Sequence, residues 1–140
     1  MKNSGAESVS RLVLDTSAYS RLRHGHEAVL DAVAAAEAVL LPATVLGELG
    51  AAFELGERSK ENRVVLAGFL DEPFVSILPT NRAVARRYGR VFAGLRRAGT
   101  PIPVNDIWIA AAVLDCGGQL LTFDRHFRKV QGLDLTLLDP

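Results

Sequence analysis

Short apolar runs alternate with helix-forming segments along this chain, and that alternation limits the possible folds more than any other feature. The runs at residues 12–14, 39–41 and 120–123 are continuous and almost wholly apolar. Such runs are typical of strands that are buried on both faces of a parallel sheet. Parallel strands need crossover connections, and helical crossovers cover both faces of the sheet. The sequence therefore predicts an α/β protein of three layers, with a central parallel sheet and helices on both faces.

The predicted elements follow one another without a linker, an internal repeat or a low-complexity segment. Strands are expected at residues 11–15, 39–41, 74–78, 119–123 and 133–138. Helices are expected after an N-cap at Thr16 or Ser17 and at residues 27–38, 42–55, 59–70, 80–98 and from 106 onward. A chain of 140 residues with 49% hydrophobic content can bury a real core. We expect a single domain over residues 1–140, with a flexible polar N-terminus at about 1–10.

Composition narrows the possible partners and the compartment. The formal net charge is +0, so any nucleic-acid binding requires a local basic patch and not an overall basic field. The single cysteine, Cys116, has no partner in the chain, which is typical of a reducing compartment. Residues 1–10 lack the apolar core of a signal peptide, and no apolar run approaches the ~18 residues of a membrane span. We therefore expect a cytoplasmic protein that does not enter a membrane.

Four carboxylates lie where an unpaired charge is costly to bury. Asp15 and Asp124 each end an apolar run, Asp106 opens the apolar helical stretch 107–114, and Glu48 falls on a helical stripe with Val45, Leu49, Ala52 and Phe53. Ligands of parallel α/β sheets bind beyond the carboxyl ends of the strands, where these acids would meet. Clustered carboxylates repel one another unless a cation neutralises them, and oxygen ligands prefer Mg²⁺ or Mn²⁺. The sequence therefore predicts one divalent-metal site.

Each acid also has an ordinary structural explanation. Asp106 can cap its helix, and Asp15 and Asp124 can be turn residues. Glu48 can bend its side chain to reach solvent, although no cationic residue lies three or four positions away to pair with it. The metal site is favoured because all four acids fall where the predicted fold gathers ligands.

Four short motifs carry a resemblance that extends over nearly the whole chain. They are Leu14-Asp15-Thr16-Ser17, residues 44–49, residues 105–111 and residues 121–127. In this order and spacing the sequence resembles the PIN-domain ribonucleases, and among them the VapC-type toxins of bacterial toxin–antitoxin pairs. No acidic position of the family pattern is missing. The resemblance implies the three-layer PIN fold and a Mg²⁺-dependent endoribonuclease. It also implies a protein that is usually a homodimer and is silenced by a cognate antitoxin, whose tail occupies a groove of the toxin.

The resemblance also assigns roles to particular residues. Asp15, Asp106 and Asp124 would hold the metal, with Glu48 bound directly or through water, and the ion would activate water for in-line attack on an RNA phosphodiester. Ser17 and Thr122 are candidates for orienting carboxylates or water, unless they are ordinary capping or turn hydroxyls. The antitoxin groove is expected to be lined by exposed apolar residues of the helices from 42 and 59, namely Leu46, Leu55, Val65 and Phe69.

RNA binding requires cations, and residues 80–98 contain six arginines and no acid. Arg82, Arg86 and Arg90 are four residues apart, share a helix face and can follow a phosphate backbone. A solvated outer face of an amphipathic helix is the alternative for these residues. Arg125 is either a phosphate contact or part of a surface ion pair.

Other residues and two rival functions complete the sequence-based hypothesis. His24, His26 and His126 are assigned surface or structural roles because none has a cysteine or histidine partner at metal-site spacing, and Trp108 is assigned to the core. A dehalogenase-type phosphatase would need Asp-x-Asp, whereas Ser17 occupies the second acidic position. A catalytically inactive PIN-type module that binds RNA or protein would be expected to have lost acids. No motif identifies the RNA target.

Overall fold

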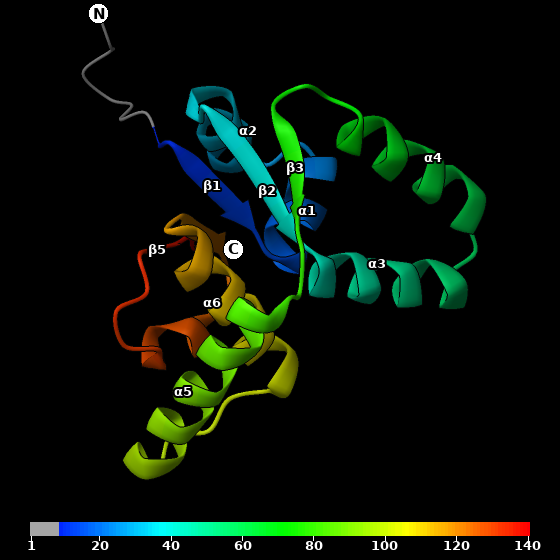
Figure 1. The fold of residues 1–140 in the computed structure, drawn as a ribbon. Helices are drawn as coiled ribbons and strands as arrows, with labels where there is room; N and C mark the ends of the chain where they lie inside the picture. The colour runs from blue at the N-terminus through cyan, green and yellow to red at the C-terminus, as the bar shows by residue number, and fades with distance from the viewer. Residues whose placement is uncertain (1–8) are drawn as a thin grey trace, which may run out of the picture.

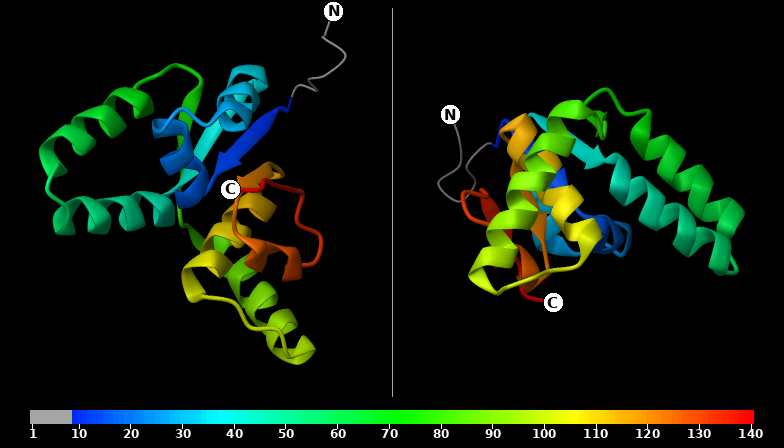
Figure 2. Two further views of the ribbon diagram at one scale, coloured as in Figure 1. Left: turned by 180° about the vertical axis from the view of Figure 1, so that it is seen from behind. Right: turned by 60° about the horizontal axis from the view of Figure 1, so that its bottom comes forward.

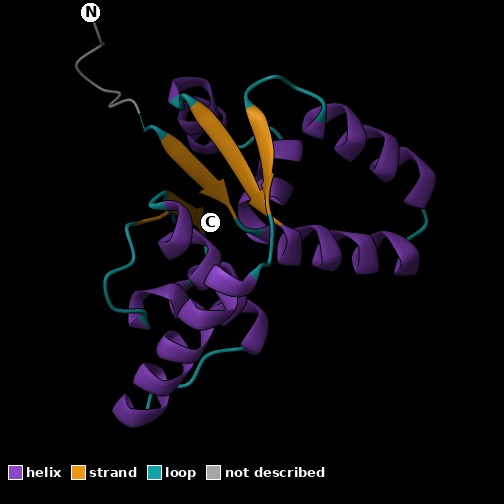
Figure 3. Cartoon of the chain, viewed as in Figure 1, coloured by secondary structure: helices purple, strands orange, loops and turns teal. Residues whose placement is uncertain are grey.

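The computed structural model describes residues 9–140, and its centre is a five-stranded sheet in which every pair of neighbouring strands is parallel. The strand order is β3-β2-β1-β4-β5. The strands are β1 (Arg11–Leu14), β2 (Ala38–Pro42), β3 (Val75–Leu78), β4 (Gln119–Thr122) and β5 (Leu135–Leu137). Figure 1 and Figure 3 show β1, β2 and β3 side by side, with their carboxyl ends at one edge. The predicted fold class is confirmed.

Helices connect successive strands and lie on both sides of the sheet. α1 and α2 lie behind the sheet in Figure 1 and come forward in the left view of Figure 2, while α6 lies in front of the sheet in Figure 1. α5 packs along α6, and α3 and α4 project from the sheet as a pair. The bounds are α1 (Thr16–Arg23), α2 (Glu27–Ala35), α3 (Ala43–Leu55), α4 (Ser59–Leu70), α5 (Arg82–Ala98), α6 (Val104–Cys116) and the 3₁₀ helix η1 (Arg125–Lys129).

The continuous apolar runs form the centre of the core, as their composition predicts. Leu12, Val13 and Leu14 of β1 and Leu120 and Leu121 of β4 are almost completely inaccessible to solvent. Full burial of one such side chain stabilises the fold by about 1.5–3 kcal/mol relative to exposure. α6 adds a helix that is buried from Ile107 to Val113 except at Trp108, including its three consecutive alanines at 110–112. The core therefore fixes the positions of β1, β4 and α6. Asp15 follows β1, Asp124 follows β4, and Asp106 lies on α6.

Several predicted boundaries are wrong, for local physical reasons. The helix predicted over 27–38 ends at Ala35, because Ala38 already pairs with Arg11 in the sheet. Pro42 does not begin α3 but ends β2, where it pairs with Leu78. The N-cap of α1 is neither Thr16 nor Ser17 but the acid that precedes them.

Three further differences lie near the ends of the elements. α6 begins at Val104, so Asp106 lies in its first turn and does not open it. β4 ends at Thr122, and the sequence did not predict η1. The expected flexible N-terminus falls mainly on residues 1–8, which lie outside the described residues. No helix in residues 9–140 is long and apolar enough to cross a membrane.

Candidate metal centre

Asp15 lies at the carboxyl end of β1, where it is 4% exposed and accepts three hydrogen bonds. As the N-cap of α1 it accepts from the backbone N–H of Ala18 at 2.8 Å, because the first N–H groups of a helix have no partner within it. The hydroxyl of Ser17 donates to the same oxygen, Oδ1, at 2.7 Å. The hydroxyl of Thr122 donates to the other oxygen, Oδ2. The carboxylate of Asp15 is therefore held in a fixed orientation from both sides.

The two hydroxyls also connect Asp15 to the segment that follows β4. The backbone N–H of Phe123 donates to Oγ of Ser17 at 3.2 Å, and that of Asp124 donates to Oγ1 of Thr122 at 3.0 Å. Burial raises the pKa of Asp15 above its ordinary value, the hydrogen bonds from Thr122, Ala18 and Ser17 lower it, and the charge of Asp124 raises it. Burial is the largest effect. Asp15 is thus a costly charge whose position links β1, α1 and the end of β4.

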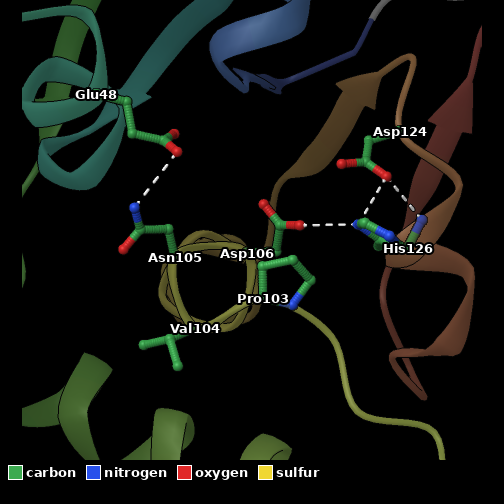
Figure 4. Close-up of a pocket in the computed structure, with 7 residues that line it drawn as sticks. All are labelled: Glu48, Pro103, Val104, Asn105, Asp106, Asp124 and His126. Carbon is green, nitrogen blue, oxygen red and sulfur yellow. Dashed lines mark hydrogen bonds and ion pairs between the residues drawn. The ribbon is translucent and has the colours of Figure 1, made fainter. Parts of the chain in front are cut away.

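Asp106 and Asp124 meet at His126 (Figure 4). Nδ1 of His126 lies 3.2 Å from Oδ2 of Asp106 and 3.1 Å from Oδ1 of Asp124. Asp124 is the N-cap of η1 and accepts from the backbone N–H of His126 at 2.9 Å, so the turn itself returns the imidazole to the acid. One ligand atom from each of the three residues lies within 4.8 Å of the others. The three side chains therefore form a compact group of potential ligands.

Glu48 extends from α3 toward this group and is held by two neutral donors. The hydroxyl of Thr16 donates to its Oε1 at 2.6 Å, and the side-chain amide of Asn105 donates to its Oε2 at 3.4 Å. Figure 4 shows Glu48 directed toward Asn105, across the pocket from Asp124. Its side chain is half-buried. The inward orientation predicted from the apolar stripe is present, without a cationic partner.

The pocket has a volume of about 460 Å³ and no cationic side chain other than histidine in its lining. It is lined by Glu48, Pro103, Val104, Asn105, Asp106, Asp124 and His126. The pKa of Asp106 is raised to about 6, mainly by desolvation and also by the charges of Asp124 and Glu48, while the hydrogen bond and charge of His126 oppose the rise. The site is therefore a partly desolvated region of negative charge that lacks a fixed compensating cation.

The structure brings together most, but not all, of the predicted site residues. Glu48, Asp106 and Asp124 line the pocket, whereas Asp15 does not line it and its oxygens are occupied by the three donors described above. Arg82, Arg86 and Arg90 are exposed on α5 and do not line the pocket. Arg125 is exposed beside Asp124 and forms no ion pair with any residue between 9 and 140.

Sequence reasoning missed three residues of this region: Thr16, Asn105 and His126. All three lie within the motifs that carry the resemblance, but His126 was judged only by the absence of cysteine or histidine partners. The sequence feature that could have identified His126 is its spacing from Asp124, because a residue two positions after an N-cap residue can turn its side chain back toward the cap. Trp108, assigned to the core, is half-buried and stacks on Tyr88 with a centroid separation of 4.0 Å.

A family model described as "PIN domain" matches residues 12–133. The chain belongs to the PIN-domain family. A search of curated protein sequences found no significant match to this PIN domain. Solved structures with low sequence identity share its fold, and each covers nearly the whole of both chains.

Three of these structures illustrate how closely the fold is shared. VapBC2 from Rickettsia felis, bound to a DNA fragment from its promoter, has a TM-score of 0.81 at 20% identity and covers 92% of this chain and 99% of its own. VapBC-1 from nontypeable Haemophilus influenzae has a TM-score of 0.79 at 19% identity, with 91% and 97% covered. VapC20 from Mycobacterium tuberculosis, a sarcin–ricin loop cleaving toxin, has a TM-score of 0.68 at 17% identity, with 92% and 99% covered.

The donor atoms of this PIN domain fit a divalent cation. Asp106, Asp124 and the nearby Glu48 offer carboxylate oxygens, which Mg²⁺ and Mn²⁺ prefer. Desolvation, and to a smaller extent the neighbouring negative charges, raise the pKa of Asp106, and a bound cation relieves this cost of the charged form. The imidazole of His126 is a further potential donor in the same group.

Replacing Asp106 with Asn is expected to remove a pH-dependent part of the stability of the metal-free protein. The pKa of Asp106 is about 6 in the folded protein against an ordinary value of 3.8, so the folded state binds this proton more tightly than the unfolded chain. Its contribution to the free energy of unfolding therefore rises as the pH falls from about 7 to about 4. In chelator, the unfolding free energy of the wild type minus that of Asp106→Asn should rise over this range in urea titrations. A difference that stays constant with pH would show that Asp106 is not in a desolvated, negatively charged site.

Proposed function

We propose that this PIN domain is a Mg²⁺-dependent endoribonuclease and the toxin of a VapBC-type toxin–antitoxin pair, with Mn²⁺ as a possible substitute. The observation that carries the proposal is the meeting of Glu48, Asp106 and Asp124 in one pocket without a compensating Lys or Arg. The fold shared with VapBC structures and with a VapC toxin that cleaves the sarcin–ricin loop supports it. We further propose a homodimer, a hetero-oligomer with the antitoxin, and a cytoplasmic location.

Asp106 and Asp124 are the residues that would hold the ion, with Glu48 acting directly or through water and Asp15 acting from the buried side of the site. When bound, a divalent ion supplies Lewis acidity, which activates water as a nucleophile and offsets negative charge on a phosphodiester. No histidine base is then required. The remaining contributions to the reaction come from the side chains that fix these acids.

Ser17 and Thr122 act by positioning. Their hydroxyls hold the carboxylate of Asp15 and accept the backbone N–H groups of Phe123 and Asp124, so they keep the start of η1 beside β1. Thr16 and Asn105 restrict Glu48 in the same way. Carboxylates that are already oriented need no reorganisation when the substrate binds. Such preorganisation is the main source of electrostatic catalysis. Arg125, exposed next to Asp124, would contact a phosphate of the RNA.

The alternative is an inactive PIN-type module that binds RNA or protein. All four acids are present, and three of them share the pocket, so nothing at the site indicates loss of activity. RNA cleavage distinguishes the two functions.

Replacing Asp106 with Asn should abolish RNA cleavage while the fold remains. The substitution removes one charge and nearly keeps the side-chain shape, so we expect cleavage in Mg²⁺ to fall by roughly a hundredfold or more, because a carboxylate that would hold the ion at the reacting phosphate is lost. Growth arrest on expression should disappear as well. Gel analysis of RNA after incubation with purified protein measures the loss.

The exposed Asp115, which lies on the same helix and outside the pocket, provides the matched control. Asp115→Asn makes the same chemical change and should keep cleavage within a few-fold of the wild type. Wild-type cleavage by a folded Asp106→Asn protein would remove Asp106 from the proposed machinery.

The α3–α4 pair is the surface on which we propose that the antitoxin binds. α4 has no fully buried residue, Leu55 at the end of α3 is 90% exposed, and Val64 on α4 is 66% exposed. Of the groove residues expected from the sequence, only Leu55 is exposed; Leu46 and Phe69 are half-buried against the core, and Val65 is half-buried. An apolar face of this kind on a projecting helix pair fits an amphipathic helix of a partner.

Leu55→Ser and Val64→Ser should each weaken the complex with the antitoxin encoded by the neighbouring small reading frame. Loss of one buried aliphatic contact corresponds to a reduction in affinity of roughly tenfold or more, measured by titration calorimetry. Leu30→Ser, at a partly exposed leucine on α2, should leave the affinity unchanged. If no neighbouring gene encodes a protein that both binds and suppresses cleavage, the toxin assignment is wrong even where the nuclease assignment holds.

A further inference from the structure

A second cleft, separate from the acidic pocket, lies between α5, the end of α6 and the end of η1. Its volume is about 580 Å³, within the range of roughly 300–1,000 Å³ that is usual for ligand sites. Its larger apolar side chains are Val91, Leu95, Leu114 and Val130. Leu95 and Val130 are buried and the other two are half-buried, so they form a floor on which a flat apolar group can lie.

Three cations surround this floor: Arg90 on α5, and Arg128 and Lys129 on η1. No acidic residue lines the cleft, and within residues 9–140 none of the three forms an ion pair. The neighbouring Arg87 does pair with an acid, Asp115, at 3.3 Å. In a chain whose formal net charge is +0, three uncompensated cations at one cleft form a local positive field that attracts a polyanion.

The cleft and the acidic pocket share one short element. η1 follows Asp124 directly, contributes His126 to the pocket, and contributes Arg128 and Lys129 to the cleft. In a 3₁₀ helix, side chains three positions apart are eclipsed and the rise is about 2 Å per residue. His126 and Lys129 are therefore roughly 6 Å apart along the axis of η1. Phe127 between them is completely buried and anchors the element.

We propose that this cleft binds the RNA strand that the acidic pocket cuts, at a nucleotide near the scissile bond. The proposal rests on the ribonuclease function proposed above. Arg90 and Arg128 contact a phosphate through their planar guanidinium groups, Lys129 contributes a point charge, and a base or ribose lies on the apolar floor. A cleft of this size admits one unpaired nucleotide and not a duplex, so the expected substrate is single-stranded at this point.

An acidic peptide is the competing ligand for such a cleft, because its carboxylates would also satisfy the three cations. RNA is favoured because η1 joins the cleft to the pocket. A substrate strand has to pass both sites, whereas a regulatory peptide need not.

The test measures binding of a short fluorescein-labelled single-stranded RNA to the Asp106→Asn protein, which should bind RNA without cutting it. Arg90→Gln and Arg128→Gln are added singly and together. Over salt concentrations from about 50 to about 300 mM, the slope of log affinity against log salt should become shallower by about 0.7 for each cation removed. Charged hydrogen bonds of ordinary strength imply that the double substitution lowers affinity by at least about tenfold.

Two matched controls separate the cleft from general charge and from general packing. Arg58→Gln and Lys60→Gln remove two charges at the start of α4, which projects away from α5 in Figure 1, and should leave the slope unchanged. Gly94 lines the cleft, and a Cβ added there would contact nothing within 4 Å. Gly94→Leu should therefore block the cleft and weaken binding without unfolding α5. Gly89→Leu, also on α5 in open space but outside the cleft, should not weaken binding.

The outcomes distinguish this proposal from the proposed function. If the double variant binds RNA with the affinity and salt slope of its parent, the cleft assignment is overturned, while cleavage by the wild type still supports the nuclease. If the cleft variants lose RNA affinity but the wild type cuts no RNA, the cleft assignment stands and the nuclease assignment fails. A loss of affinity for the antitoxin with RNA affinity unchanged overturns the cleft assignment in favour of an acidic peptide.

Discussion

The buried carboxylate of Asp15 and the hydroxyls that hold it are the interaction on which the rest of the site depends. Burial disfavours its charge, and the donors at Ala18, Ser17 and Thr122 compensate for part of that cost. Those donors belong to α1 and β4, so satisfying one acid fixes the relative positions of two elements far apart in sequence. The same hydroxyls receive the first backbone N–H groups after β4. Asp124, the turn of η1 and the return of His126 toward Asp106 follow from that arrangement.

The sequence predicted the fold and the approximate position of the acids because both depend on local patterns. Continuous apolar runs indicated buried parallel strands, and the apolar stripe around Glu48 indicated an inward acid. The donors to Glu48 could not be predicted, because Thr16 and Asn105 are 32 and 57 residues away and only the folded topology brings them together. His126 was missed for the opposite reason, since a single unpredicted 3₁₀ turn decides its direction. Some observed ends of strands and helices differ from the predicted ends because they depend on sheet pairing between distant residues, as between Arg11 and Ala38.

The chain has no net charge, but its charged side chains are separated into a negative field at the acidic pocket and a positive field at the cleft, and both sites border η1. The acidic pocket contains only carboxylates, an amide and a histidine as polar lining groups, whereas the cleft contains only cations and an amide. The proposed metal-dependent nuclease would need negative potential where it binds a cation and positive potential where it binds the RNA backbone. The buried phenylalanine of η1 packs the element that borders both fields against the core. Overall composition conceals this arrangement, which appears only when the positions of the charges are known.

Thermal stability with and without divalent metal tests most directly whether these acids form one cation site. Neutralising an acid that lines the pocket should, in chelator, leave stability unchanged or raise it, because repulsion and desolvation are relieved. At a Mg²⁺ concentration about ten times the dissociation constant, the wild type should gain about 1.4 kcal/mol. We expect Asp15→Asn and Asp124→Asn to lose most of this gain, Glu48→Gln to lose less if it acts through water, and Asp115→Asn to keep it. Equal metal-induced shifts in the wild type and all of these variants, at constant ionic strength, would show that the acids do not bind one ion together.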